Sequence, residues 1–468
     1  MVTIMPSVAQ GKPSILLIIY LLVVFGYTFS LGFYYLPGFL VLTLAFLLLV
    51  AFFFLPQIFD NFEPFNFSQL LKFSLLISAS LSLVCYGGLQ QEKGALYNLS
   101  LFLLMLCVIL IFSYFFEKPK ADSPILEFKI LNFEFVSDFV LRISDFVNHL
   151  LKYRFWLLIA IALILRIFMV FSSPNPQIDV FDILKNGPKA LLQGQNPYSQ
   201  TYNKIYIDAP ANYFAYSPGS ILAVLPFVAI FNDPRFAMIS AEILTAILIY
   251  IVGKNELLAL LFLFNPRFSF VTEQSWLDPL IPFFLLLFYY LYKIKEKESL
   301  ALFIFGFIAV IKQSFIFFPV FLLKIIAGNL KKWLWPTAAV ILTLVPFLLW
   351  NAHDLIYNVF TRYFVTVSER IPLTHRSLTL FSFWFEQFQK DIPSLILWII
   401  PLLFLTVVFI KQQKQNWLIF FAGITVFHFA LFFFSNAAFL NFYYLISQLI
   451  LLTIVIYSKE SNHESQTA

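Results

Sequence analysis

Residues 172–218 read SSPNPQIDVFDILKNGPKALLQGQNPYSQTYNKIYIDAPANYFAYSP and interrupt a chain that is otherwise almost entirely apolar. The stretch carries Asp179, Asp182, several tyrosines and the turn sequence GQNPY at 194–198. Irregular backbone is not tolerated where it faces lipid. The stretch therefore predicts a loop at a membrane surface, held there by the helices on either side.

Composition supports a membrane environment for the rest of the chain. The 468 residues are 61% hydrophobic and 12% charged, with a mean hydropathy of +0.86, whereas soluble domains are about a quarter charged. This predicts an all-α, multi-pass integral membrane protein. The net charge of +5 does not suggest a nucleic-acid partner. Cys85 and Cys107 lie in apolar runs, which argues against a disulfide framework or a thiolate metal site.

Apolar windows that can cross a hydrocarbon core of about 30 Å predict five helices before the polar loop. They run from 14 to 35, 37 to 56, 68 to 88, 96 to 115 and 155 to 171. Ten further candidates follow, at 216–231, 236–252, 256–270, 278–293, 299–311, 314–328, 334–350, 393–410, 416–434 and 440–457.

Lysine and arginine set the expected orientation. The segment 117–154 holds six of them, which places it in the cytoplasm and the following loop outside. If 216–231 crossed fully, the basic clusters at 293–299 and 331–332 would lie outside. We therefore expect that segment to be a re-entrant or juxtamembrane helix, which leaves about 14 transmembrane helices.

This topology predicts five parts. They are an N-terminal four-helix extension (1–116), a cytoplasmic connection (117–154), a catalytic core (155–332) with external loop 173–216, C-terminal helices (333–457) with external loop 351–379, and a cytoplasmic tail (458–468). Five polar segments then gather on the external face, namely 173–216, 272–278, 312–313, 351–379 and 435–441. A single external active site would require that convergence.

Acidic residues supply the candidate catalytic groups. Asp179 and Asp182 share a face if their segment is helical, and a carboxylate there can act as a general base or help hold a divalent cation. Exposure or helix capping is the alternative for each. Glu273 and Asp278 flank Trp276 and are either substrate contacts or ordinary helix caps.

Cationic and aromatic residues complete the candidate site. Lys312 lies between two apolar runs, where a cation is usually kept for a ligand, and it suits a phosphate; snorkelling to lipid phosphate is the alternative. Arg362 and Arg376 suit phosphate too, or bind lipid headgroups nonspecifically. The tyrosines can stack on sugar or form an interfacial belt. The remaining candidate substrate contacts are Asn196, Tyr198, Tyr216, Gln274, Trp276 and Gln313.

Four stretches in order carry a resemblance: DVFDILKNGPKALLQGQNPYS (179–199), YFAYSPGSILAVLPFVAIFNDPR (213–235), FNPRFSFVTEQSWLDPLI (264–281) and the KQ pair (312–313). They resemble multi-spanning glycosyltransferases of the GT-C fold, and are most similar to bacterial polyprenyl-phosphate-mannose-dependent mannosyltransferase-like proteins. The similarity covers 155–330 and, loosely, 334–457. The stretches are moderately specific as an ordered set and weak singly.

The resemblance implies a GT-C-like bundle and an inverting transfer of a monosaccharide from a polyprenyl-phosphate donor. It assigns the acceptor-activating acid to Asp179, with Asp182 second, and the donor-phosphate contact to Lys312. The chain departs from the pattern by placing the loop after the fifth helix and by lacking an adjacent pair of acids. The exact base and any cation requirement therefore stay open.

The chemistry of the transfer requires the same two kinds of group, one cation and one carboxylate. The sugar leaves a phosphate anion, so a cation must stabilise the leaving group, and the acceptor hydroxyl needs one base. The expected partners are the polyprenyl-phosphate sugar, membrane lipids and an external glycan, lipid or protein acceptor. The alternatives are a polymerase or ligase of lipid-linked glycans and a polytopic lipid or sugar transporter.

Overall fold

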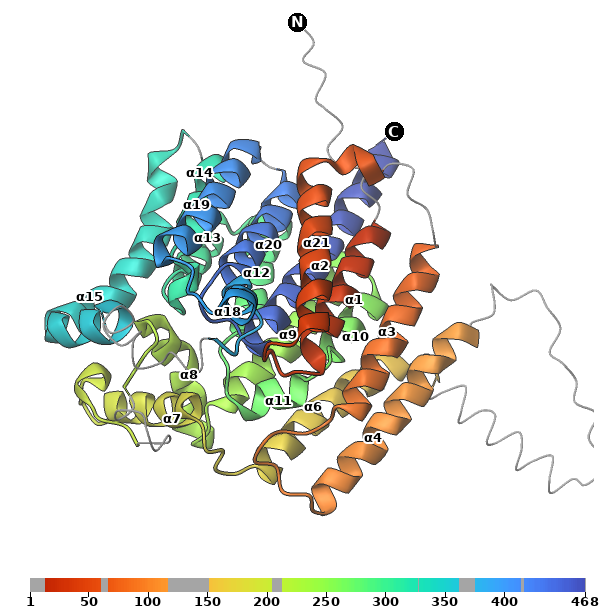
Figure 1. Ribbon diagram of the computed structural model, residues 1–468, viewed down its shortest axis with the longest axis horizontal. Helices are drawn as coiled ribbons and strands as arrows, with labels where there is room; N and C mark the ends of the chain where they lie inside the picture. Colours follow the sequence, from red (N-terminus) through yellow and green to blue (C-terminus); the bar gives the residue numbers. More distant parts are fainter. Residues whose placement is uncertain are drawn as a thin grey trace, which may run out of the picture.

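The computed structural model describes residues 13–59, 66–116, 151–203, 213–326, 328–361, 375–413 and 416–467. Within these ranges the protein is helical, and its β-structure is an isolated bridge between Phe33 and Ser377. Figure 1 shows the long helices standing side by side in one bundle, with the end of the last helix opposite α7 and α8.

Most helices follow the apolar windows of the sequence, but the window expected at 256–270 is broken at residues 265–267 into two short helices. They are α1 (Pro13–Thr28), α2 (Leu36–Phe54), α3 (Phe67–Val84), α4 (Ala95–Phe112), α6 (Arg154–Ser172), α7 (Asp179–Leu192), α8 (Pro218–Phe231), α9 (Arg235–Gly253), α10 (Glu256–Leu263), α11 (Phe268–Glu273), α12 (Leu280–Tyr289), α13 (Glu298–Ile308), α14 (Phe318–Ile325), α15 (Leu334–Ile356), α18 (Leu380–Phe388), α19 (Ser394–Lys411), α20 (Trp417–Phe433) and α21 (Leu440–Thr467).

Seven helical stretches in the described residues are long and apolar enough to cross a membrane. They are Leu36–Phe54, Phe67–Val84, Ala95–Phe116, Arg154–Ser172, Arg235–Gly253, Leu330–Thr361 and Leu440–Glu460. Seven more apolar helices are 10–17 residues long. The chain thus has the helical, membrane-type construction that its composition predicts. The figure of 14 crossings and their orientation stay predictions.

Local sequence explains where several helices begin. The side-chain oxygens of Asn66, Asn255 and Asn416 accept hydrogen bonds from backbone N–H groups in the first turns of α3, α10 and α20. Such caps satisfy donors that have no partner inside the helix. Inside α15, Asn351 has a non-helical backbone (φ −160°, ψ 93°), so the helix is kinked there.

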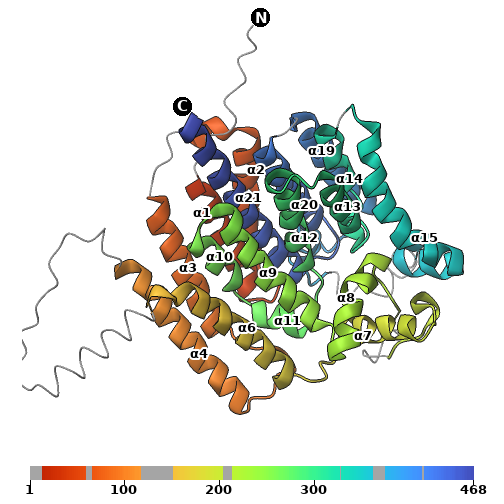
Figure 2. The ribbon, with the colours of Figure 1, turned by 180° about the vertical axis from the view of Figure 1, so that it is seen from behind.

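The polar loop contains a helix of its own, α7, packed against α8. Its buried side chains are mostly apolar and include Phe181, Ile183 and Leu184, while Lys185 and Asn186 lie toward its polar side. Figures 1 and 2 show α7 and α8 together at the end of the bundle where α6 ends and α9 begins. A re-entrant α8 within a membrane stays a prediction.

The bundle core contains a buried ion pair that the hydropathy windows did not predict. Arg166 on α6 donates from Nε to Glu242 on α9 at 2.6 Å, and both side chains are at most 2% exposed. The hydroxyl of Tyr444 on α21 donates to the other oxygen of Glu242 at 2.6 Å, and Arg166 also donates to the carbonyl of Leu263 at 2.8 Å. Four helices therefore share one charged cluster.

A second polar cluster occupies the break between α10 and α11. The side-chain oxygen of Asn265 accepts from the hydroxyls of Tyr27 (2.9 Å) and Tyr20 (3.3 Å), and its amide donates to Ser447 (2.7 Å). Arg267 has a left-handed backbone (φ 69°) and donates to the carbonyl of Thr28. The four-helix extension and the core are therefore joined by buried polar contacts as well as by apolar packing.

Replacing Glu242 with glutamine should strongly destabilise the fold. The change leaves the Arg166 charge buried without a counter-charge, and breaking a buried ion pair in this way costs about 3 kcal/mol or more. The free energy of unfolding of the full chain in detergent measures the loss.

Glu298→Gln is the matched control. Lys332 and Glu298 form an ion pair whose side chains are 31% and 39% exposed, and exposed pairs contribute about 1 kcal/mol or less. Equal losses in the two variants would show that burial of the Arg166–Glu242 pair has no special weight.

Candidate functional site

The five polar segments expected on one face contact one another. The contacts join residues that are far apart in the chain. Together they link the five segments into a ring at one end of the bundle. They are Ser173 to Glu273 (3.0 Å), Gln313 to the Ala215 carbonyl, Lys312 to Asp278 (2.9 Å), Asn441 to Asp278 (3.0 Å), Leu378 N–H to the Ala438 carbonyl (3.2 Å) and Asn358 to the Tyr198 carbonyl (2.7 Å). Which side of a membrane this end faces stays a prediction.

Lys312 and Asp278 form a buried ion pair at the centre of this end. Lys312 lies between α13 and α14 and is 8% exposed, and Asp278 is 1% exposed. The second Asp278 oxygen accepts from Asn441, and the Lys312 ammonium lies 4.3 Å from the centre of the Phe442 ring. The ammonium is thus held by protein groups, as a cation in apolar surroundings requires.

Glu273 fastens the connection between α3 and α4 to the core. Its carboxylate is fully buried and accepts from the N–H groups of Leu89 (2.5 Å) and Gln90 (2.8 Å), and from Ser173 and Gln274. A side chain at Gly88 would place a Cβ 2.0 Å from the Glu273 carboxyl carbon, so only glycine permits this approach. Glu273 stands at the end of α11 but binds another segment rather than capping its own helix.

The two acids of α7 have different environments. Asp182 is 8% exposed and its oxygens accept from Asn186 (2.8 Å) and from the backbone and side chain of Asn203 (3.0 and 2.7 Å). Asp179, the first residue of α7, is only partly buried, and its Oδ1 accepts from the Val180 N–H at 2.8 Å. The N-terminal end of a helix favours the ionised carboxylate.

The GQNPY turn has the conformation that its residues predict. Gly194 has a φ of +73°, and the Asn196 side chain accepts from the Tyr198 N–H at 3.0 Å. Tyr198 is 2% exposed, and its hydroxyl donates to the Tyr216 carbonyl at 2.8 Å. Asn196 and Tyr198 therefore hold the loop together in this structure.

The other candidates in the described residues are buried or partly buried, apart from one exposed cation. Gln274 is buried against Glu273, Gln313 donates to backbone carbonyls, and Trp276 packs edge-on against Phe270 with ring centres 5.4 Å apart. Arg376 is exposed, although its carbonyl accepts from the Tyr34 N–H at 2.7 Å. Tyr216 is partly buried, and Arg362 lies outside the described residues.

Metal ligation has little support in the part of the chain that the structure describes. No group of three His, Cys, Asp or Glu side chains lies there in an arrangement that could hold a metal ion. A divalent cation stays a prediction.

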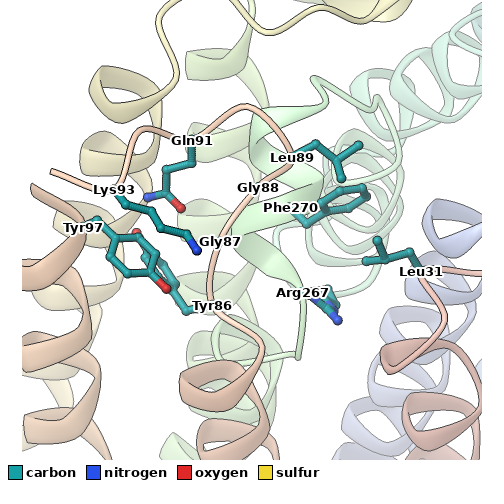
Figure 3. A pocket seen from close by; sticks show the side chains of 10 residues that line it. All are labelled: Leu31, Tyr86, Gly87, Gly88, Leu89, Gln91, Lys93, Tyr97, Arg267 and Phe270. Atoms are coloured by element: carbon teal, nitrogen blue, oxygen red, sulfur yellow. The ribbon is translucent and has the colours of Figure 1, made fainter.

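One cavity at this end of the bundle involves none of the candidate residues. It has a volume of about 250 Å³ and lies beside the α3–α4 connection. Arg267 and Lys93 line it, as Figure 3 shows. Hydropathy analysis missed both residues, although an arginine after the Asn265–Pro266 helix break was a visible signal.

We expect Lys312→Met alone to be more harmful than Lys312→Met combined with Asp278→Asn. The single change leaves the Asp278 carboxylate buried without a cation, at a cost of about 3 kcal/mol or more, while the double change removes both charges. Unfolding of the purified chain in detergent measures the difference. A double variant that loses the sum of the two single losses would contradict the pairing.

A scan of protein-family models, a search of curated proteins and a search of solved structures found no match for this chain.

Proposed function

We propose that this protein is an integral-membrane glycosyltransferase. It transfers a monosaccharide from a polyprenyl-phosphate donor to a hydroxyl of an external glycan, lipid or protein. Asp179 takes the proton from the acceptor hydroxyl, the new glycosidic bond forms at the anomeric carbon, and the bond to the donor phosphate breaks. The phosphate leaves as an anion.

The observation that carries the proposal is the contrast in exposure among the four candidate acids Asp179, Asp182, Glu273 and Asp278. Asp182, Glu273 and Asp278 are buried, and every one of their carboxylate oxygens accepts at least one hydrogen bond. Asp179 alone of the four is partly exposed. A general base must reach its substrate, so Asp179 is favoured over Asp182.

Cations at the same end can stabilise the departing phosphate. Arg376 has an exposed side chain, and the backbone from its carbonyl onward is held in place: the carbonyl accepts from Tyr34, and the next two residues contact Phe33 and Ala438. A guanidinium presented from fixed backbone suits a phosphate. Lys312 also brings positive charge to this end of the bundle. Its ammonium is already bound to Asp278, so we propose that it acts on the phosphate through its charge and not by direct contact.

Asp179→Asn should abolish transfer without lowering stability. Loss of a general base typically reduces the rate by about a hundredfold to ten-thousandfold, and the amide is nearly the same size. The measurement is conversion of a radiolabelled polyprenyl-phosphate monosaccharide by the purified chain in detergent, with thermal unfolding recorded in parallel.

Asp182→Asn is the internal control. It weakens the hydrogen bonds to Asn186 and Asn203, so it should lower the unfolding temperature and reduce transfer only partly. Normal turnover by Asp179→Asn would overturn the assignment of the base. Use of only an oligosaccharide donor would indicate a glycan polymerase or ligase, and movement of the donor across vesicles without product would indicate a transporter.

A further inference from the structure

The cavity beside the α3–α4 connection is built mainly from two parts of the chain, with Leu31 from the connection between α1 and α2 added to them. One wall comes from residues 86–97, and the other from Arg267 and Phe270 around the break between α10 and α11. Figure 3 shows Lys93 and Arg267 on opposite sides of the backbone at Gly87 and Gly88. Gly87 keeps its part of the lining free of a side chain, and a Cβ there would lie 3.3 Å from Gln91 Oε1.

The cavity is rigidly positioned. Glu273 accepts from the N–H groups of Leu89 and Gln90, and the Gly87 N–H donates to Ser269 Oγ at 3.2 Å. On the other side, Arg267 donates to the carbonyls of Thr28 (2.8 Å) and Cys85 (3.1 Å). A ligand would therefore meet a formed site, with little ordering of the chain on binding.

The electrostatics of the cavity favour an anion. Lys93 and Arg267 each bring a positive charge to its lining, and the Arg267 contacts to carbonyl oxygens leave that charge unneutralised. The nearby carboxylate, Glu273, lies behind residues 88–90 with both oxygens occupied by four donors.

Two polar side chains on the lining have capacity for a ligand. The Tyr86 hydroxyl and both amide atoms of Gln91 are buried, and they make no hydrogen bond within the described residues. Tyr86 is 7% exposed and lies near Ser100 and Gln91, without the geometry of a hydrogen bond to either. Buried polar atoms nearly always have a partner, and an acceptor oxygen of a ligand would pair with the two donors among them, the Tyr86 hydroxyl and Gln91 Nε2.

The rim of the cavity is apolar. Leu31, Leu89 and Phe270 line it, and Leu89 is 63% exposed. A volume of about 250 Å³ accommodates a phosphate with a few attached atoms, but not an acyl or prenyl chain, which would run outward over this rim.

We propose that this cavity binds the phosphate of an anionic ligand, either the headgroup of a lipid at this end of the bundle or a free phosphate compound. Lys93 and Arg267 contact the phosphate oxygens from the lining of the cavity, and the Tyr86 hydroxyl and Gln91 Nε2 donate to them. The site contains none of Asp179, Lys312 or Arg376, so transfer assays test the proposed function separately.

Native mass spectrometry of the full chain in a nonionic detergent tests the proposal. Dioctanoyl phosphatidylglycerol should bind at one site, whereas dioctanoylglycerol, which has the same chains and no phosphate, should not. Inorganic phosphate identifies the source: if it competes with the lipid, the site serves free phosphate compounds too, and if it does not, the site requires a headgroup with chains. Both outcomes support a phosphate site.

Two substitutions separate binding from folding. Lys93 is exposed, so Lys93→Gln should leave unfolding unchanged and weaken lipid binding about tenfold, as expected for one charge-assisted hydrogen bond. Tyr86→Phe removes a hydroxyl that has no partner in the described residues, so it should keep or raise the unfolding temperature while also weakening binding.

Lys390→Gln is the matched control, since Lys390 is exposed and does not line the cavity. Equal binding of the two dioctanoyl lipids, no binding of either phosphatidylglycerol or inorganic phosphate, or binding that both Lys93→Gln and Tyr86→Phe leave unchanged would each overturn the proposal.

Discussion

A charge placed in an apolar bundle must find a partner there, since removing an ion from water costs several kcal/mol even after the protein relaxes around it. In this protein the requirement is met by contacts between helices that are distant in the chain. Arg166 joins α6 to Glu242 on α9, and Lys312 joins the α13–α14 connection to Asp278. Apolar packing alone is compatible with many arrangements of similar helices. Each of these ion pairs forms only in an arrangement that brings its two segments together.

The same constraint explains why the polar segments at one end of the bundle are bonded to one another rather than only lying side by side. Glu273 can be buried only because four donors reach it, and two of them are backbone N–H groups of the α3–α4 connection. The four N-terminal helices are therefore tied to the end that carries the candidate site. Tyr20 and Tyr27 on α1 add two hydroxyls bound to Asn265.

Hydropathy predicted the helices well, because their length and composition are local properties. α2, α3 and α6 each begin and end within a few residues of the expected windows. The turn at Gly194 and the position of Lys312 between two short helices were also readable, since glycine and a lone cation in an apolar run are strong local signals. The hydrogen-bond and ion-pair partners of these residues could not be predicted from the sequence. Asp278 is 34 positions from Lys312 and Leu89 is 184 from Glu273, and a single sequence carries no signal of such pairing.

The break between α10 and α11 has a consequence for how this chain can evolve. Within residues 263–267 the carbonyls of Leu263 and Phe264 and the side chains of Asn265 and Arg267 bind groups on α1, α3, α6 and α21, or in the connection after α3. Inserting one residue there would move the groups on one side of the insertion away from partners that are fixed on four other helices, which would break several of these contacts at once. The segment should therefore tolerate neither insertion nor deletion, and replacements in it should be accompanied by replacements on the helices that it joins.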